Sequence, residues 1–115
     1  VVHRGHLYFN AVRNPKALCC MSLDGKLIWD DGPDFYLGAC LLADDLMLIQ
    51  DGKNGDLCLI ESSPSGFKIL ARARLFPVKQ GEPWAPLALS KGKLLIRDGE
   101  QMLCVDLEKP NTARK

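Results

Sequence analysis

Short runs of apolar residues, separated by turns rich in Gly, Asp and Asn, extend along the whole chain. Runs of this kind are typical of β-strands, and no window keeps the spacing of apolar residues that an amphipathic helix requires. The pattern therefore predicts an all-β fold. The expected strands cover residues 6–10, 17–23, 26–30, 38–43, 46–50, 56–61, 67–75, 85–90, 93–97 and 101–107.

A strand, a polar turn and a second strand recur three times along the chain. Each second strand contains a cysteine within its apolar run, and Cys19, Cys58 and Cys104 are 39 and 46 residues apart. Because these cysteines recur with the repeat, we interpret them as packing positions rather than redox centres. Repeats of ~40–45 residues built from β-strands are typical of β-propeller blades.

The repeat predicts a β-propeller fragment of four-stranded antiparallel blades, one complete and two partial. The expected units are a partial blade over 1–34, a complete blade over 35–76, a partial blade over 84–107 and a tail over 108–115. We expect the first unit to lack its first strand, with residues 1–3 as a remnant of that strand or as its connecting turn. A β-sandwich is the alternative, although it would not require the repeat.

The number of blades indicates that the chain is incomplete as a propeller. Propellers close with ~4–8 blades, which at ~40–45 residues per blade needs at least about 160 residues. The chain has 115 residues. We therefore expect it to be the C-terminal part of a larger propeller, whose remaining blades, or a second copy of the chain, would cover the exposed blade faces.

Composition and charge narrow the classes of partner. The chain is 47% hydrophobic and 25% charged with a net charge of +1, as in ordinary globular proteins. This balance argues against a nucleic-acid partner, which would need a clustered basic patch. No apolar run approaches the ~20 residues of a membrane span, so we expect none.

The segment from Met21 to Trp29, with the sequence MSLDGKLIW, resembles the repeat signature of the quinoprotein-like (PQQ-like) β-propeller family. In that family a strand ends in Asp, a Gly turn follows, and the next strand carries a Trp. The resemblance implies that Asp24, Gly25 and Trp29 dock neighbouring blades, with Trp29 packed between blades and tied down by the Asp and the turn amides. The turn is shorter here than in the family pattern, and only this copy carries the Trp.

Some members of that family bind the quinone together with calcium, and some have a disulfide between adjacent cysteines. Cys19 and Cys20 are adjacent in this chain. Neighbouring residues of a strand point to opposite faces, so we expect no disulfide between them. The chain has five cysteines, an odd number, and no CxxC motif, so we expect all five to be free thiols in the core.

No group of residues has the spacing of a catalytic or metal site. The loop 51–56 (DGKNGD) comes closest to a calcium loop but lacks its terminal Glu. His3 and His6 are three residues apart and form no HxH or HExxH motif, and residues 62–66 read as a polar loop without a GxSxG nucleophile motif. We therefore predict no catalytic, cofactor-binding or metal-binding residue in this chain.

Trp84 is a candidate contact residue at the rim of the propeller. It lies between Pro83 and Pro86, in a loop that enters the first expected strand of the last unit. A rigid Trp there suits a binding anchor. The alternative is packing between blades, which is favoured because aromatic residues recur at Phe35 and Tyr36, the matching place in the preceding unit.

These observations predict a non-catalytic propeller module that acts as a binding or scaffold domain for a protein or carbohydrate partner. The alternative is the C-terminal part of a PQQ-dependent dehydrogenase whose active site lies in other blades. A third hypothesis is a sensor domain of a larger membrane protein or kinase. The resemblance implies export, whereas free cysteines suit a reducing compartment, and we expect an extracytoplasmic, periplasmic location.

Overall fold

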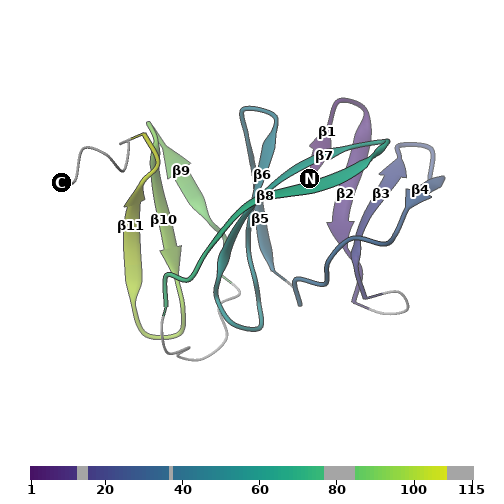
Figure 1. Ribbon diagram of the computed structural model, residues 1–115. Coiled ribbons are helices and arrows are strands. Elements are labelled where there is room, and N and C mark those ends of the chain that lie inside the picture. The colour runs from purple at the N-terminus through teal and green to yellow at the C-terminus, as the bar shows by residue number, and fades with distance from the viewer. Residues whose placement is uncertain (13–15, 37, 77–84, 109–115) are drawn as a thin grey trace.

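The computed structural model describes residues 1–12, 16–36, 38–76 and 85–108, which contain β-strands and no helix (Figure 1). The strands form three antiparallel sheets of four, four and three strands, so the predicted all-β fold is confirmed. The first sheet contains β1 (Val2–His3), β2 (His6–Asn10), β3 (Leu18–Ser22) and β4 (Leu27–Trp29). The second contains β5 (Ala39–Ala43), β6 (Leu46–Gln50), β7 (Leu57–Ser63) and β8 (Gly66–Ala73). The third contains β9 (Ala88–Ser90), β10 (Lys93–Arg97) and β11 (Met102–Asp106).

Ten of these strands lie where apolar runs predicted them, with ends that differ by a few residues. Of the two alternatives left open for residues 1–3, the strand remnant is confirmed, because residues 2–3 form the short strand β1. It pairs Val2 with Leu7 and His3 with His6, and it is only two residues long. No helix among the described residues could cross a membrane.

Each sheet begins with the same kind of tight turn between its first two strands. The turn residues are Arg4-Gly5, Asp44-Asp45 and Lys91-Gly92, and all six have positive φ angles. Positive φ at both central residues is the mark of the type I′ turn, whose twist suits a two-residue hairpin. In Figure 1 the three turns lie at the same, upper end of the molecule.

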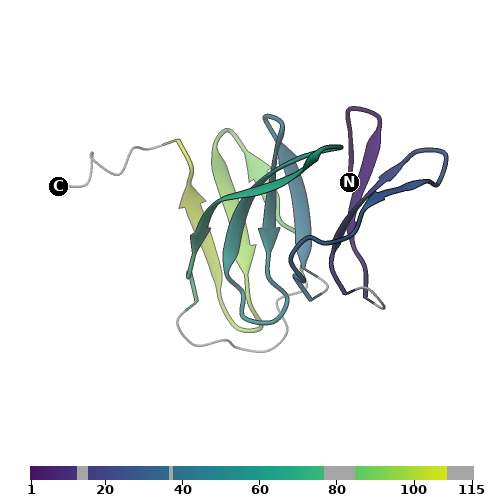
Figure 2. The same ribbon diagram turned by 45° about the vertical axis from the view of Figure 1, so that its right-hand side comes forward.

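The three sheets lie side by side, and the second is covered on both faces (Figures 1 and 2). Met47 and Ile49 of β6 pack in a core with residues of the first sheet, whereas Leu48 between them packs in a second core with residues of the third sheet. We call these cores the first seam and the second seam. Coverage of both faces explains why β6 is a continuous apolar run, since alternate side chains point to opposite faces.

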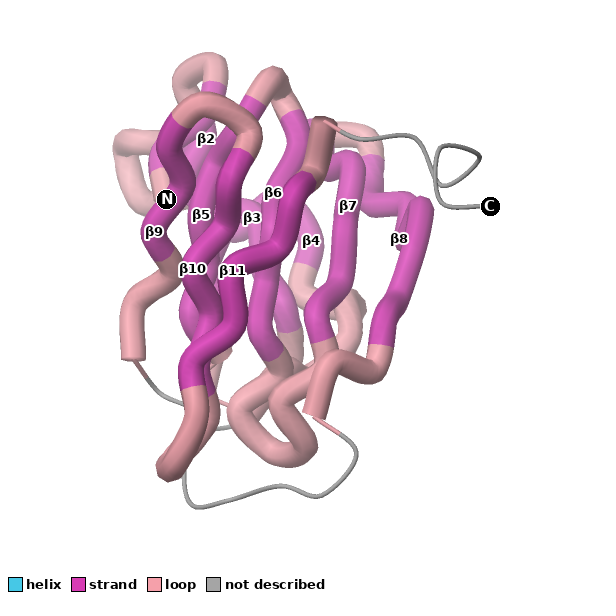
Figure 3. Tube along the Cα trace, turned by 90° about the vertical axis from the view of Figure 1, so that its left-hand side faces the viewer, coloured by secondary structure: helices cyan, strands magenta, loops and turns pink. Residues whose placement is uncertain are grey.

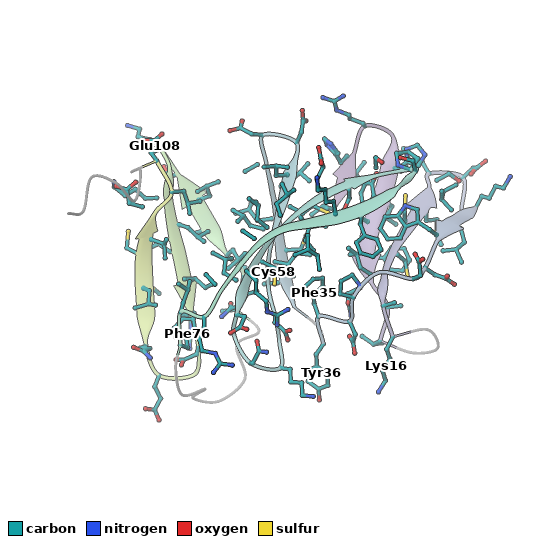
Figure 4. The ribbon with its side chains drawn as sticks, in the orientation of Figure 1. Lys16, Phe35, Tyr36, Cys58, Phe76 and Glu108 are labelled. Atoms are coloured by element: carbon teal, nitrogen blue, oxygen red, sulfur yellow. The ribbon has the colours of Figure 1, made fainter. Side chains whose placement is uncertain are left out.

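Phe35 belongs to the first seam and Phe76 to the second, and Figure 4 shows both in place. Figure 3 looks onto the third sheet, whose strands lie over those of the second. A polar contact also crosses the second seam, where the fully buried Gln50 donates from Nε2 to the carbonyl oxygen of Arg97 at 2.8 Å. The packing of one sheet on the next therefore repeats along the chain.

The long β7–β8 hairpin extends from the second sheet toward the first (Figure 1). Its pairing shifts between Leu59 and Ile60, because Leu59 pairs with Ala71 and Ile60 with Ile69, which leaves Leu70 as an extra residue. A bulge of this kind bends the strand and redirects the side chains that follow it. The hairpin tip, residues 63–66, thereby reaches the edge of the first sheet, where Ser63 accepts a hydrogen bond from Trp29.

The expectation that Cys104 repeats the position of Cys58 is wrong. Cys58 pairs with Ile49 and is fully buried in the first seam. Cys104 pairs with Leu95 and is exposed, and the residue that pairs with Ile96 in the corresponding way is Leu103. A shift of one residue moves a strand side chain to the other face of its sheet, so Cys104 is not a core thiol.

Candidate functional site

A groove lies at the rim of the first seam, where the first two sheets meet. It has a volume of about 570 Å³. Three segments line it: the β1–β2 turn, the β5–β6 turn and the β7–β8 hairpin. We call it the Ser62 groove, and its lining residues are His3, Arg4, Asp45, Glu61, Ser62, Ser63, Ser65, Gly66, Phe67 and Lys68.

Strand alternation explains why polar residues line this groove. Cys58 and Ile60 of β7 face the first seam, and Ser62 is the next residue on the same face. Met47 and Ile49 of β6 face the same seam, and the turn residue Asp45, directly before β6, lines the groove. The groove is therefore the polar continuation of an apolar seam at the rim of the molecule.

Asp45 joins the β5–β6 turn to the β1–β2 turn. Its carboxylate accepts a hydrogen bond from the guanidinium of Arg4 at 2.7 Å, and its other oxygen lies 3.7 Å from Nε2 of His3. The Arg4 and Asp45 side chains are 74% and 60% exposed, so this ion pair contributes little to stability. The His3 side chain, by contrast, is only 12% exposed.

Ser62 is buried at the floor of the groove. It is 7% exposed, and its hydroxyl has no hydrogen-bond partner among the described residues. Its cross-strand partner Phe67 contributes an aromatic ring, which packs 5.4 Å from the ring of Trp29. Close to them, the hydroxyls of Ser63 and Ser65 lie 2.8 Å apart.

Trp29, which the sequence analysis identified as a docking residue, contacts two of the residues that line the groove, Ser63 and Phe67. Its Nε1 donates to the carbonyl oxygen of Ser63 at 2.9 Å, which links β4 of the first sheet to β7 of the second. Its ring also lies 6.1 Å from that of Tyr8. Trp29 thus contacts residues of both sheets, at the edge of the first seam.

Asp24 and Gly25 form the β3–β4 turn, with Gly25 at a φ of 94°. The Asp24 carboxylate accepts a hydrogen bond from the Ser22 hydroxyl, which lowers the pKa of Asp24. The sequence predicted that this Asp and the turn amides would hold Trp29 in place. The structure shows a different partner, because the Trp29 indole donates to the carbonyl oxygen of Ser63. Trp84, the candidate rim contact, lies outside the described residues.

The loop considered for calcium carries an ion-pair cluster instead. Arg72 donates to Asp56 and to Asp51, each at 3.1 Å, and the two carboxyl side chains are 9% exposed. A second cation, Arg74, lies 3.7 Å from Asp56. Both carboxylates therefore face guanidinium groups, and the part of the chain that the structure describes contains no cluster of three or more His, Cys, Asp or Glu suited to a metal.

The cysteines adjacent in sequence are both free and lie on opposite faces of β3. Cys20 pairs with Tyr8 and faces the first seam, whereas Cys19 pairs with Phe9 on the other face. Burial raises the pKa of both thiols, which disfavours the reactive thiolate. These cysteines are therefore suited to packing rather than to nucleophilic chemistry.

A smaller groove of about 240 Å³ lies at the opposite end of the first two sheets, where Figure 4 shows Lys16 and Tyr36. Asn10, Val12 and Asp34 complete its lining. None of these five side chains is a buried polar group without a partner. The Ser62 groove is therefore the better candidate for ligand binding.

We found no match to this chain among protein-family models, curated proteins or solved structures.

Proposed function

We propose that this chain is part of a quinoprotein-like β-propeller and acts as a non-catalytic binding or scaffold module. One observation carries the proposal: three antiparallel sheets pack face to face in series, and each begins with the same type of turn. Serial packing of small sheets is the way in which propeller blades contact one another. Further blades of the same protein would continue the series on its two open faces.

The contacts of Trp29 support the blade-docking role that the resemblance implies. The residue lies on the last strand of one sheet and bonds to the third strand of the next. A large aromatic side chain with a polar N–H suits such a junction, because it buries apolar area while its N–H still finds an acceptor. The Gln50–Arg97 contact links the second and third sheets in a comparable way.

The binding role is supported by the groove residues rather than by a reactive group. The described residues show no hydrogen bond between a serine or cysteine side chain and a histidine, so no activated nucleophile is assembled. The Ser62 groove instead offers several charged and hydroxyl groups around one aromatic ring. Such a mixture fixes the orientation of a bound molecule.

Two experiments on the full-length protein test this function. Electron microscopy should show a ring of radially arranged sheets, and any other architecture would overturn the propeller assignment. The protein should also show no dye-linked oxidation of alcohols or sugars after addition of the quinone and calcium. Turnover under those conditions would favour the alternative, a quinone-dependent dehydrogenase.

A further inference from the structure

We propose that the Ser62 groove binds a short neutral oligosaccharide. The inference rests on the proposed binding function and gives it a site and a ligand class. Three features of the groove carry it: an aspartate where the equivalent turns have glycine, a buried hydroxyl without a partner, and a balance of charges around an aromatic ring.

Asp45 departs from the rule that the other two turns follow. The equivalent positions are Gly5, at a φ of 80°, and Gly92, at a φ of 75°, whereas Asp45 adopts a φ of 66° with a full side chain. Residues other than glycine are disfavoured in this left-handed region, although Asp tolerates it better than most. The exposed ion pair with Arg4 adds little stability, so stability does not account for an aspartate at this position. Its effect is to place a carboxylate at the mouth of the groove.

Ser62 supplies a second feature that points to a ligand. A buried hydroxyl normally has a hydrogen-bond partner, because leaving it without one costs free energy. The Ser62 hydroxyl has none among the described residues, although it lines an open groove. A serine hydroxyl can donate one hydrogen bond and accept others, and a sugar hydroxyl matches both capacities.

The charges around the groove select against ionic ligands. Arg4 and Lys68 are cations, and Asp45 and Glu61 are anions, so the rim carries two charges of each sign. This balance favours neither a phosphate nor a metal cation. It provides donors and acceptors on all sides, which suits a neutral ligand rich in hydroxyl groups.

Phe67 completes the set with an apolar surface. Its ring is half-buried, and the contact with Trp29 holds it in place. A fixed aromatic ring can pack against the C–H groups of a pyranose while the charged side chains bond to the hydroxyls. The volume of about 570 Å³ is within the range of small-ligand pockets, ~300–1,000 Å³.

The test is a calorimetric titration of the full-length protein with cellotriose, maltotriose, xylotriose and N-acetylchitotriose, and with inorganic phosphate as the anionic probe. We expect saturable binding of at least one trisaccharide and no binding of phosphate. Asp45→Gly and Ser62→Ala should each weaken that binding by at least about tenfold, the effect of one lost hydrogen bond to a well-placed group.

Thermal unfolding shows whether these variants are folded. Asp45→Gly should be as stable as the wild type or more so, because glycine occupies the equivalent turns. Asp44→Gly is the matched control: it changes the other residue of the same turn, which does not line the groove, and should leave trisaccharide affinity unchanged.

The inference would be overturned if no trisaccharide binds, if phosphate binds instead, or if the folded Asp45→Gly and Ser62→Ala variants bind as tightly as the wild type. Quinone-dependent turnover would overturn the proposed non-catalytic function, whether or not sugars bind. Failure of sugar binding in a protein without such turnover would overturn only the groove assignment.

Discussion

Tyr8 points from β2 into the first seam, where it is 1% exposed. Burial raises its pKa from 10.0 to about 12, and the neighbouring Cys20 thiol adds to the rise. Because the folded state holds the phenolic proton more tightly than the unfolded state, Tyr8 stabilises the fold fully below its unfolded pKa. That stabilisation is lost as the pH rises from about 10 to about 12.

We therefore expect the free energy of unfolding, measured by chemical denaturation, to fall over this alkaline window. The free energy of unfolding of Tyr8→Phe should fall less steeply there than that of the wild type. The absorbance spectrum of the variant should also lack the phenolate that Tyr8 forms near pH 12. Comparing the two proteins removes the contribution of other groups that titrate at high pH. Parallel curves for wild type and variant would contradict the assigned cause.

The thiols should differ in reactivity according to their burial. Cys104 is exposed, whereas Cys19, Cys20 and Cys58 are buried, and burial raises the pKa of these three. In the native protein a disulfide reagent should therefore modify Cys104 first, and Cys104→Ser should remove this fast phase. In denaturant all five thiols should react, and reducing the protein beforehand should not raise that number. A fast phase that persists in Cys104→Ser would contradict this placement.

The position of Cys104 shows a limit of the sequence at this scale. Leu103, Cys104 and Val105 are all apolar, so the period of two that tells one face of a strand from the other is absent. The spacing of the cysteines suggested one register, and pairing with β10 imposes another that differs by one residue. Register depends on the partner strand, which a local pattern does not contain.

At the scale of elements, the strands could be predicted and the Ser62 groove could not. The ten predicted strands are local apolar runs bounded by turn residues, and such runs require no knowledge of their partners. The groove gathers His3, Asp45 and Ser62 from three segments distant in sequence. Residues 62–66 read as a polar loop, although Ser62 and Ser63 belong to β7 and Gly66 begins β8. The one available signal was the Asp44-Asp45 pair, which replaces the Gly found in the equivalent turns.

Trp29 should be the main side chain that ties β4 to the second sheet. Trp29→Ala should lower the free energy of unfolding by about 3 kcal/mol, because it removes a large aromatic contact from the first seam. Trp29→Phe keeps much of the ring and loses the bond to Ser63, so it should cost only about 1 kcal/mol. Ile28→Ala, which truncates the exposed neighbour on the same strand, is the matched control for chemical denaturation. Equal losses for Trp29→Ala and Ile28→Ala would contradict this role.

Arg72 should stabilise the loop between β6 and β7 through two carboxylates. Arg72→Met would leave Asp51 and Asp56 without their shared cation, and because both carboxylates are largely buried we expect a loss of about 2 kcal/mol. Arg74→Met should cost less, since Arg74 is 65% exposed and lies 3.7 Å from Asp56. Chemical denaturation of the two variants at neutral pH gives the comparison. A larger loss for Arg74→Met would contradict the assignment of Arg72 as the main partner.

At the scale of the whole molecule, the third sheet differs from the second because the described residues cover only one of its faces. Leu94 and Ile96 face the second seam and are at most 1% exposed. Leu95 and Met102 belong to the opposite face, where they are 42% and 60% exposed. With the exposed Cys104 they form an apolar patch beside the Lys93–Asp106 ion pair, and such a patch favours association with another surface.

We therefore expect the 115-residue chain to self-associate with rising concentration, as measured by sedimentation velocity. The double variant Leu95→Lys/Met102→Lys should remain monomeric, because charges on this face disfavour its burial. Leu70→Lys is the control, since Leu70 is equally exposed but lies on β8 of the second sheet. In the proposed propeller the next blade covers the outer face of the third sheet, so the full-length protein should not associate through it. Association that survives in the double variant, or that is lost in Leu70→Lys, would place the contact on another surface and weaken the case that this face receives a blade.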